Sequence, residues 1–401
     1  MNTPRSLSRV ACVADLRAVA RRRLPRAIFD FIDGGADDEL TLKANRADLD
    51  RVLFKPRCLV DVARIDTGCT ILGRPQGMPL GISPTGLATL ACPDGELALA
   101  REAAASEIPM ILSTLSGCTL EDVAATGPAS RWFQLYVFRD RAITESLVAR
   151  AAQAGYQALV LTVDVPVAGK RRRDIRSGFT IPMAPSAATV LDLACHPRWC
   201  FDAFRHGLPR LRNLDAFVTN AGAQTHATLI NSQLGSGLDW SVLAWLRSLW
   251  PGKLVIKGLL STEDALRAAE AGVDGIVVSN HGGRQQDAVP SSISMLARMA
   301  PLLRGGPELF IDSGIRSGAD IVRAIALGAR AALIGRATLY GAAAAGQAGI
   351  RHCLDLLQAE LERTMALLGL TAIDQIGPDC LAALPWPESD ARTPPDLARH
   401  S

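Results

Sequence analysis

The sequence lacks the features of a membrane-spanning, secreted or nucleic-acid-binding protein. No apolar run reaches the roughly 18 residues that a helix needs to cross a bilayer. No apolar segment follows the three arginines at 21–23, so we expect no signal peptide. The 43 Lys and Arg residues nearly balance the 40 Asp and Glu residues, which argues against a nucleic-acid partner. Nine cysteines lie scattered without a C-x-x-C pair, so we expect free thiols in a reducing, cytoplasmic compartment and no metal site.

A further absence bears on the fold. No G-x-G-x-x-G follows an early apolar run, which weakens the case for a Rossmann fold. Instead, short runs that are apolar on both faces alternate with helical patterns, as buried parallel strands do in an α/β protein. Eight such units predict a (β/α)8 TIM barrel. The expected strands are 79–84, 109–114, 131–137, 158–166, 253–258, 275–283, 308–314 and 331–336.

The segments between and around these strands complete one domain of residues 1–384. Residues 1–78 are expected to form a helical N-terminal cap, and residues 79–346 the barrel. A long insertion, 183–238, follows the fourth strand, and the Pro-rich residues 385–401 predict a disordered tail. Helices that open on polar or acidic residues are expected at 94–106, 140–154, 239–249, 262–271 and 317–327.

The carboxyl ends of the expected strands carry many polar residues, and these ends form the working face of a TIM barrel. The last two strands end in DSGIRSG and IGR. Their Gly-rich turns, with a helix start at Ser317, expose backbone N–H groups to an anion. Arg316 and Arg336 add positive charge there, so these two ends predict a phosphate site.

Candidate catalytic residues lie at the other strand ends. His281 ends the sixth strand and Asp164 the fourth; a carboxylate beside an imidazole fixes its tautomer and favours its protonated form, which suits a general base. Arg171 and Arg284 are candidates for binding a substrate carboxylate, because a guanidinium fork matches its geometry. Lys257 closes the fifth strand, where it would either form a Schiff base or neutralise an electron-rich cofactor ring.

The motifs VVSNHGGRQ, VIKG, DSGIRSG, IGR, FQLY and LTVDVP together resemble the FMN-dependent 2-hydroxy acid dehydrogenases and oxidases. The resemblance runs from about residue 10 to about residue 380, strand by strand. It implies that His281 accepts a proton from the substrate and that Asp164 stabilises the imidazolium. Arg171 and Arg284 would hold the substrate carboxylate, and Tyr136 would hydrogen-bond its hydroxyl end.

The resemblance also implies an FMN site. Lys257 would sit by flavin N1 and the O2 carbonyl, where negative charge builds up on reduction, and this role replaces the Schiff base. Ser279 would lie close to the flavin side chain. The residues expected around the isoalloxazine ring are Pro84, Thr85, Gly86, Ser113, Gln134 and Thr162, and those around the ribityl phosphate are Asp312, Gly314, Arg316, Gly335 and Arg336.

Within this family the chain resembles most the bacterial membrane-associated branch that oxidises (S)-mandelate or L-lactate to a 2-keto acid. The insertion supports this, because Trp199, Phe201 and Phe204 are interleaved with Arg198 and Arg205. Such a mixture suits an anionic bilayer surface. We therefore expect a peripheral protein on the inner face of the cell membrane that passes electrons to a membrane quinone.

Three positions bear on the substrate and acceptor. Phe31 stands where the family commonly has a Tyr that donates to the substrate carboxylate, and losing that contact costs about 1.5–3 kcal/mol of binding. Leu115 lies where relatives vary above the flavin, so it is expected to set substrate size. Gly86, where oxidases often carry Ala, favours a dehydrogenase.

The expected function is oxidation of an (S)-2-hydroxy acid, most directly (S)-mandelate or a related aromatic acid. The alternatives within the family are an L-lactate dehydrogenase and an oxidase that uses O2. A phosphate-substrate lyase or isomerase using Lys257 represents a different class, and an FMN-binding protein without turnover, suggested only by Phe31, represents a third. The resemblance further implies a homo-oligomer such as a tetramer.

Overall fold

The computed structural model describes residues 7–127, 130–180, 186–207, 210–218, 237–382 and 386. Parts of the insertion expected at 183–238 lie outside these ranges. So does the tail expected at 385–401, apart from Trp386, which packs against the main hydrophobic core.

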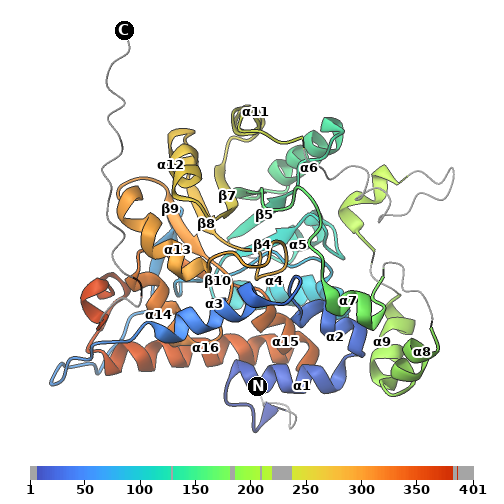
Figure 1. The fold of residues 1–401 in the computed structure, drawn as a ribbon, viewed down its shortest axis with the longest axis horizontal. Helices are drawn as coiled ribbons and strands as arrows, with labels where there is room; N and C mark the ends of the chain where they lie inside the picture. Colours follow the sequence, from blue (N-terminus) through green and yellow to red (C-terminus); the bar gives the residue numbers. More distant parts are fainter. Residues whose placement is uncertain are drawn as a thin grey trace.

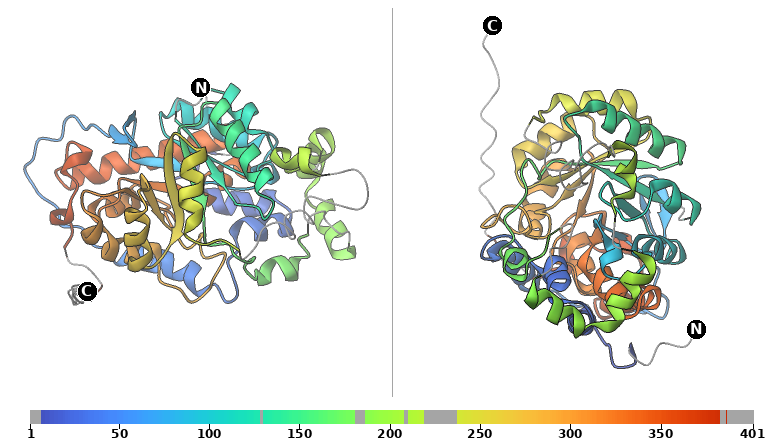
Figure 2. Two further views of the ribbon diagram at one scale, coloured as in Figure 1. Left: turned by 90° about the horizontal axis from the view of Figure 1, so that it is seen from above. Right: turned by 90° about the vertical axis from the view of Figure 1, so that its right-hand side faces the viewer.

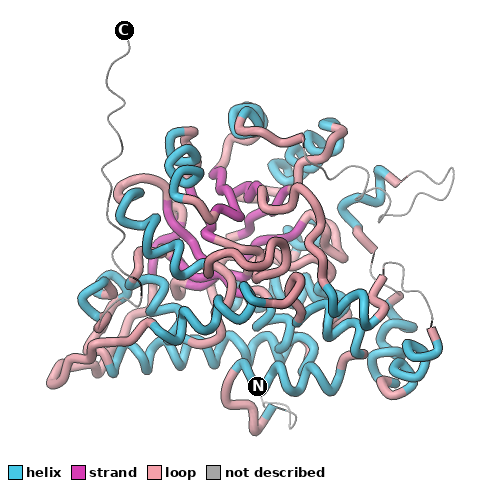
Figure 3. Tube along the Cα trace, in the orientation of Figure 1, coloured by secondary structure: helices cyan, strands magenta, loops and turns pink. Residues whose placement is uncertain are grey.

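Eight parallel strands close into a barrel at the centre of the molecule, and helices surround it (Figures 1 and 3). The strands follow one another around the barrel in chain order, with the last pairing with the first. This confirms the predicted TIM barrel and each of its strands. They are β3 (Leu80–Ile82), β4 (Met110–Ser113), β5 (Arg131–Leu135), β6 (Ala158–Thr162), β7 (Lys253–Leu259), β8 (Gly275–Val278), β9 (Glu308–Ile311) and β10 (Ala331–Ile334).

The barrel interior is filled by side chains rather than open. Trp132 and Phe310 meet edge to face with ring centroids 5.4 Å apart, and Val160 and Val255 join the same fully buried cluster. A short antiparallel hairpin, β1 (Cys69–Ile71) and β2 (Arg74–Gln76), adds Ile71 to this cluster. The hairpin falls within residues 1–78, which were expected to form a helical cap, and its three-residue strands are too short to show a strand period in the sequence.

The outer helices include all five that the sequence predicted and four more. Three of the five predicted helices begin with a side-chain cap, made by Asp140, Ser261 and Ser317, and Ser317 forms a reciprocal capping box with Asp320. Two of the others follow the last strand, and one of these, α15, is so rich in buried Ala that no amphipathic period is visible. The helices are α4 (Gly95–Ala105), α5 (Leu120–Ala125), α6 (Arg141–Gln153), α11 (Ser241–Leu249), α12 (Thr262–Glu270), α13 (Ser292–Met299), α14 (Gly318–Ala326), α15 (Arg336–Ala345) and α16 (Gln347–Leu367).

The N-terminal segment forms a cap of three helices, α1 (Val13–Arg23), α2 (Arg26–Asp33) and α3 (Leu40–Arg51). Helix α1 packs on α15, and α2 packs on α7 (Arg172–Ser177), which follows β6. The cap therefore reaches the face of the barrel where the strands end (Figure 1).

Within the insertion, helices α8 (Ala187–Ala194) and α9 (Pro197–His206) project from the side of the molecule (Figures 1 and 2). Two hydrogen bonds fasten them: the Asp192 carboxylate accepts from the N–H of Arg26 at 2.7 Å, and the Trp199 indole donates to the Leu90 carbonyl at 3.0 Å. Among the described helices, none is long and apolar enough to cross a membrane.

Candidate active site

A cavity of about 730 Å³ opens where the barrel strands end, beneath the cap. It brings together residues from all eight strand ends, as parallel strands in a barrel require. Every predicted site residue lines it except Asp164 and Ser279, which hydrogen-bond to the lining residues His281 and Lys257. Across the described ranges, no cluster of three or more His, Cys, Asp or Glu side chains could hold a metal ion.

His281 and Asp164 form the pair that the sequence predicted. The imidazole Nδ1 lies 3.0 Å from Asp164 Oδ1, so Nε2 is the ring nitrogen left for a substrate. Burial raises the pKa of Asp164, but the positive charges of His281 and Lys257 outweigh it and hold that pKa below its usual value. The ionised carboxylate fixes the tautomer of the imidazole and stabilises its protonated form.

Local backbone geometry makes this pair possible. Gly258 has φ +108°, and a Cβ on it would lie 2.6 Å from Asp164 Cγ, so only glycine leaves room for the carboxylate. His281 itself has φ +57°, which is uncommon for a residue with a side chain and recurs at functional sites. Its N–H donates to Ser279 Oγ at 3.0 Å, which holds the strained turn.

Lys257 is buried and multiply bonded. Its Nζ lies 3.0 Å from Ser279 Oγ and 3.3 Å from Asp312 Oδ2. Burial lowers the pKa of Lys257, but the carboxylates of Asp312 and Asp164 outweigh it and raise the pKa. An ammonium held in its protonated form by two carboxylates is a poor nucleophile, so this geometry disfavours a Schiff-base role and suits stabilisation of negative charge.

The wall of the cavity fits a flavin ring. Gln134 Oε1 accepts from Ser113 Oγ at 3.1 Å, while its Nε2 is buried without a partner in the described part of the chain. Thr162 Oγ1 is also buried and has no hydrogen-bond partner among the described residues. Buried polar atoms need partners, and the carbonyl and N–H edge of an isoalloxazine would supply them. Gly86 keeps the opposite wall open, because a Cβ there would lie 3.1 Å from the Leu115 carbonyl oxygen.

The last two strand ends present positive charge, as a phosphate site requires. Arg336 is buried and donates to the carbonyls of Ile32 and Gly34 at 3.0 and 2.8 Å. Burial holds the pKa of Arg336 below its usual value. Arg316 stacks on Tyr340, and the turn at Gly314 has φ +99°. Neither arginine forms an ion pair with a carboxylate of the described residues, so both positive charges are available to bind a phosphate.

Two further arginines line the same cavity, and one of them, Arg284, lies close to Arg336, since both donate to the Gly34 carbonyl. Arg284 Nη1 donates to the carbonyls of Phe31 and Gly34 at 2.7 and 2.9 Å, and Arg171 pairs with Asp174 at 2.6 Å. Burial, and then the charges of Arg171 and Arg336, hold the pKa of Arg284 below its usual value. Two guanidinium groups this close and this buried favour an anionic ligand between them.

Phe31 and Tyr136 complete the substrate end. Arg171 and Arg284 flank the Phe31 ring at 5.7 and 5.1 Å from its centroid, and Phe31 stacks on Phe179 at 4.3 Å. Burial, and then the charge of Asp164, raise the pKa of Tyr136, so its hydroxyl stays protonated and can donate a hydrogen bond.

Sequence reasoning missed three contributors to this site. Asp174 lies one helical turn after Arg171, a spacing that could have indicated the pair. Nothing in the sequence around Phe179 indicates that its ring enters the site. Leu211 comes from the insertion and lines the cavity, held in place by buried Asn213, whose Oδ1 accepts from the N–H of Leu120 at 2.9 Å. Leu211 and Leu214 are buried apolar residues in a stretch rich in arginine, and their spacing could have indicated that it packs on the barrel.

The fold and this site together define a flavin-dependent oxidoreductase of the TIM-barrel class. The chain belongs to the FMN-dependent dehydrogenase family, whose profile matches residues 20–383. This confirms the predicted family, the enzyme class and the FMN cofactor, and it overturns the lyase or isomerase alternative that used Lys257.

Named relatives cover nearly the whole chain. It is 46% identical to (S)-mandelate dehydrogenase of Pseudomonas putida over 92% of this chain and 93% of the relative. It is also 46% identical to a putative L-lactate dehydrogenase of Mycobacterium tuberculosis, over 93% and 89%. The crystal structure of the monotopic membrane protein (S)-mandelate dehydrogenase superposes with a TM-score of 0.89 at 45% identity, covering 93% of this chain and 99% of that one.

Proposed function

We propose that the protein oxidises an (S)-2-hydroxy acid with an aromatic side chain, such as (S)-mandelate, to the 2-keto acid. The observation that carries this proposal is the single cavity in which His281, paired with Asp164, faces the same space as Arg171 and Arg284. FMN, when bound, supplies the two-electron acceptor. The named relatives that act on mandelate and lactate support the same substrate class.

The chain's own residues divide the work. Arg171 and Arg284 bind the substrate carboxylate, and Tyr136 donates to the oxygen of the reacting carbon. His281 takes up the substrate proton at Nε2, and Asp164 offsets the positive charge that the imidazole then carries. Lys257, protonated and buried, stabilises negative charge on the far side of the cavity.

The apolar part of the cavity favours an aromatic substrate over lactate. Four apolar side chains line the cavity beside Arg171 and Arg284, and none of the four offers a polar group. They are Leu115, Ile175, Phe179 and Leu211. A methyl group would contact little of this wall, whereas a phenyl ring could bury most of its surface against it. L-lactate is the second candidate substrate, because several relatives are named L-lactate dehydrogenases.

The test is a substrate panel monitored by flavin colour. The purified holoenzyme is expected to be yellow, because oxidised flavin absorbs blue light, and to lose this absorbance when (S)-mandelate is added without air. L-lactate and glycolate should bleach it more slowly, and (R)-mandelate not at all. Faster bleaching by lactate would replace the aromatic substrate by the second candidate, and no bleaching by any 2-hydroxy acid would overturn the proposal.

The insertion supports a peripheral contact with a membrane and, with it, a quinone as electron acceptor. On α9, Phe201 and Phe204 are 60% and 89% exposed, and Leu191 on α8 is 70% exposed. Arg198, Asp202 and His206, spaced four residues apart, line the hollow between α9 and the barrel instead. Trp199 packs on the core, but Phe201 and Phe204 present a second apolar surface to the outside, as in a helix that lies on a membrane surface.

Two further expectations stay proposals. Gly86 favours a dehydrogenase over an enzyme that reduces O2, because oxidases of the family often carry Ala at this position. In this chain a Cβ at residue 86 would lie 3.3 Å from Leu115 Cβ and would narrow the cavity at that wall. Slow reoxidation of the bleached enzyme in air, against fast reoxidation by a quinone analogue, is the expected behaviour. A homo-oligomer such as a tetramer is supported only by the resemblance to the family.

A further inference from the structure

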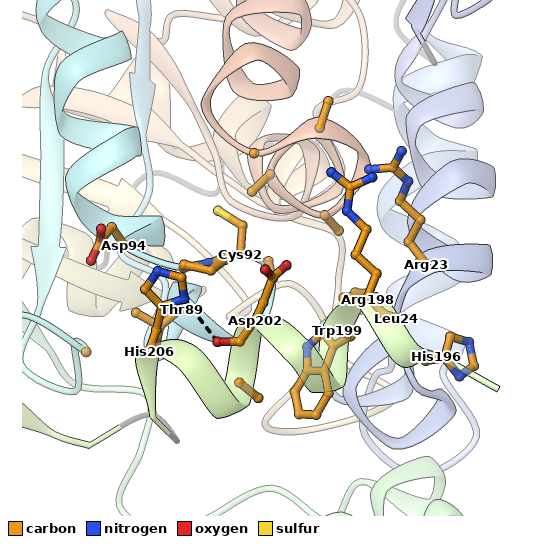
Figure 4. Close-up of a pocket in the computed structure, with 18 of the residues that line it drawn as sticks. Arg23, Leu24, Thr89, Cys92, Asp94, His196, Arg198, Trp199, Asp202 and His206 are labelled. Atoms are coloured by element: carbon orange, nitrogen blue, oxygen red, sulfur yellow. Dashed lines mark hydrogen bonds between the residues drawn. The ribbon is translucent and has the colours of Figure 1, made fainter. Parts of the chain in front are cut away.

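A second hollow, larger than the active-site cavity, lies between the insertion and the outer side of the barrel. It encloses about 1380 Å³ and is lined by α1, the loop after β3, α9 and the end of α15 (Figure 4). We call it the basic hollow, because its positive side chains outnumber the two carboxylates of Asp94 and Asp202. Its arginines are Arg22, Arg23, Arg198, Arg210 and Arg212.

Arg23 and Arg198 are the central pair. Figure 4 shows their guanidinium groups next to each other, one reaching from α1 and the other from α9. Neither has a carboxylate within ion-pair distance among the described residues, whereas Arg150, on the outer helix α6, pairs with Glu121 at 2.8 Å. Burial, and then the charge of Arg198, hold the pKa of Arg23 below its usual value. Two like charges face each other here with nothing in the described chain to neutralise them.

The pair results from the way the insertion is fastened. The Trp199 indole donates to the Leu90 carbonyl, which fixes α9 at its first turn, directly beside Arg198. The Asp192 carboxylate caps the N–H of Arg26 and so fixes α8 just beyond the end of α1. These two anchors bring Arg198 against Arg23, and the repulsion between them has to be offset by a ligand or by solvent.

We propose that the basic hollow binds the phosphate group of an acidic phospholipid, with Arg23 and Arg198 as its ligands. Guanidinium forks match phosphate oxygens, and a phosphate between two of them removes the repulsion. A lipid is the occupant that fits, because α9 carries Arg198 on its hollow-facing side and exposed Phe201 and Phe204 on the other. The inference rests on the proposed membrane contact and adds a specific headgroup site to it.

The experiment measures binding of the holoenzyme to vesicles of phosphatidylcholine alone or mixed with phosphatidylglycerol. Arg23→Gln and Arg198→Gln are compared with Arg21→Gln and Arg205→Gln, which change exposed arginines on the same two helices outside the hollow. The hollow variants should weaken binding to acidic vesicles about tenfold or more, as for a lost hydrogen-bonded ion pair. The controls should lose about fivefold or less, as for one surface charge. Bleaching by substrate should be unchanged in all four, which also shows that they fold.

The possible outcomes separate this inference from the functions proposed above. Equal losses in all four variants would overturn it in favour of diffuse surface charge. Equal binding of the wild type to both kinds of vesicle would overturn it while leaving the membrane contact intact, and no binding to either would overturn both. The melting temperature is measured with glycerol phosphate in solution and with acidic vesicles. An equal rise with both would show a site for free phosphates and would overturn the lipid site.

Discussion

The active-site cavity and the basic hollow are both rich in arginine, and they differ in what holds those arginines. In the cavity, Arg284 and Arg336 are fixed by backbone carbonyls and Arg171 by a carboxylate. In the basic hollow, Arg23 and Arg198 have no such anchor among the described residues. The cavity is therefore organised before a ligand arrives, as catalysis requires, whereas the hollow is suited to reversible binding at a surface.

One helix end accounts for much of the order in the cavity. The Gly34 carbonyl, just past the end of α2, accepts from both Arg284 and Arg336. The negative end of a helix dipole suits such cations. Asp33, one residue earlier, accepts from Arg17, Arg173 and Tyr340 and so fastens this helix end to the rest of the protein. The cap thus joins the expected substrate arginine to the expected phosphate arginine.

The largest expected effect comes from removing the base in the preorganised cavity. His281→Gln should keep the yellow colour and the substrate affinity but slow anaerobic bleaching by about 10²–10⁴-fold, the usual contribution of a general base. Rapid mixing with (S)-mandelate measures this rate. Arg198→Gln is the matched control in the basic hollow and should bleach at the wild-type rate. Wild-type bleaching by the His281 variant would remove the assigned base.

An intermediate effect should come from removing the exposed part of the insertion. Deleting 187–207 takes away α8 and α9 with Phe201 and Phe204, and the protein should move from the membrane fraction to the supernatant while still reducing a dye. A longer deletion of 187–218 also removes Leu211 and Asn213, so dye reduction should fall as well. Sedimentation with vesicles and a dye assay measure both. Retention of the shorter variant on membranes would place the contact elsewhere.

The contrast between the two regions also explains what the sequence could predict. The strand ends were predicted residue by residue, because parallel strands in a barrel bring their carboxyl ends to one face whatever the details of packing. Phe179 and Leu211 were missed, since each enters the cavity from a segment with no regular relation to the strands. The basic hollow was missed for the same reason: Arg23 and Arg198 meet only through the docking of α9 on the barrel.

The smallest expected effect tests how finely the cavity is organised at Phe31. Phe31→Tyr would add a hydroxyl beside Arg171 and Arg284, the two groups that flank this ring. A hydrogen bond to a charged carboxylate contributes about 1.5–3 kcal/mol, so the dissociation constant for the substrate should fall tenfold or more. Titration with (S)-mandelate in the His281→Gln background, where bleaching is slow enough to leave the substrate bound, measures that constant directly.

Phe179→Tyr is the control for this change, since it adds the same hydroxyl to the stacked partner ring, 4.3 Å away. It should leave the dissociation constant within about twofold, as expected for a polar group without a defined partner. If both variants tighten binding equally, the gain comes from general polarity near the arginines. If Phe31→Tyr alone weakens binding, the aromatic face of Phe31 is itself a substrate contact, and the cavity is adapted to an acid whose ring stacks where the family's tyrosine would donate.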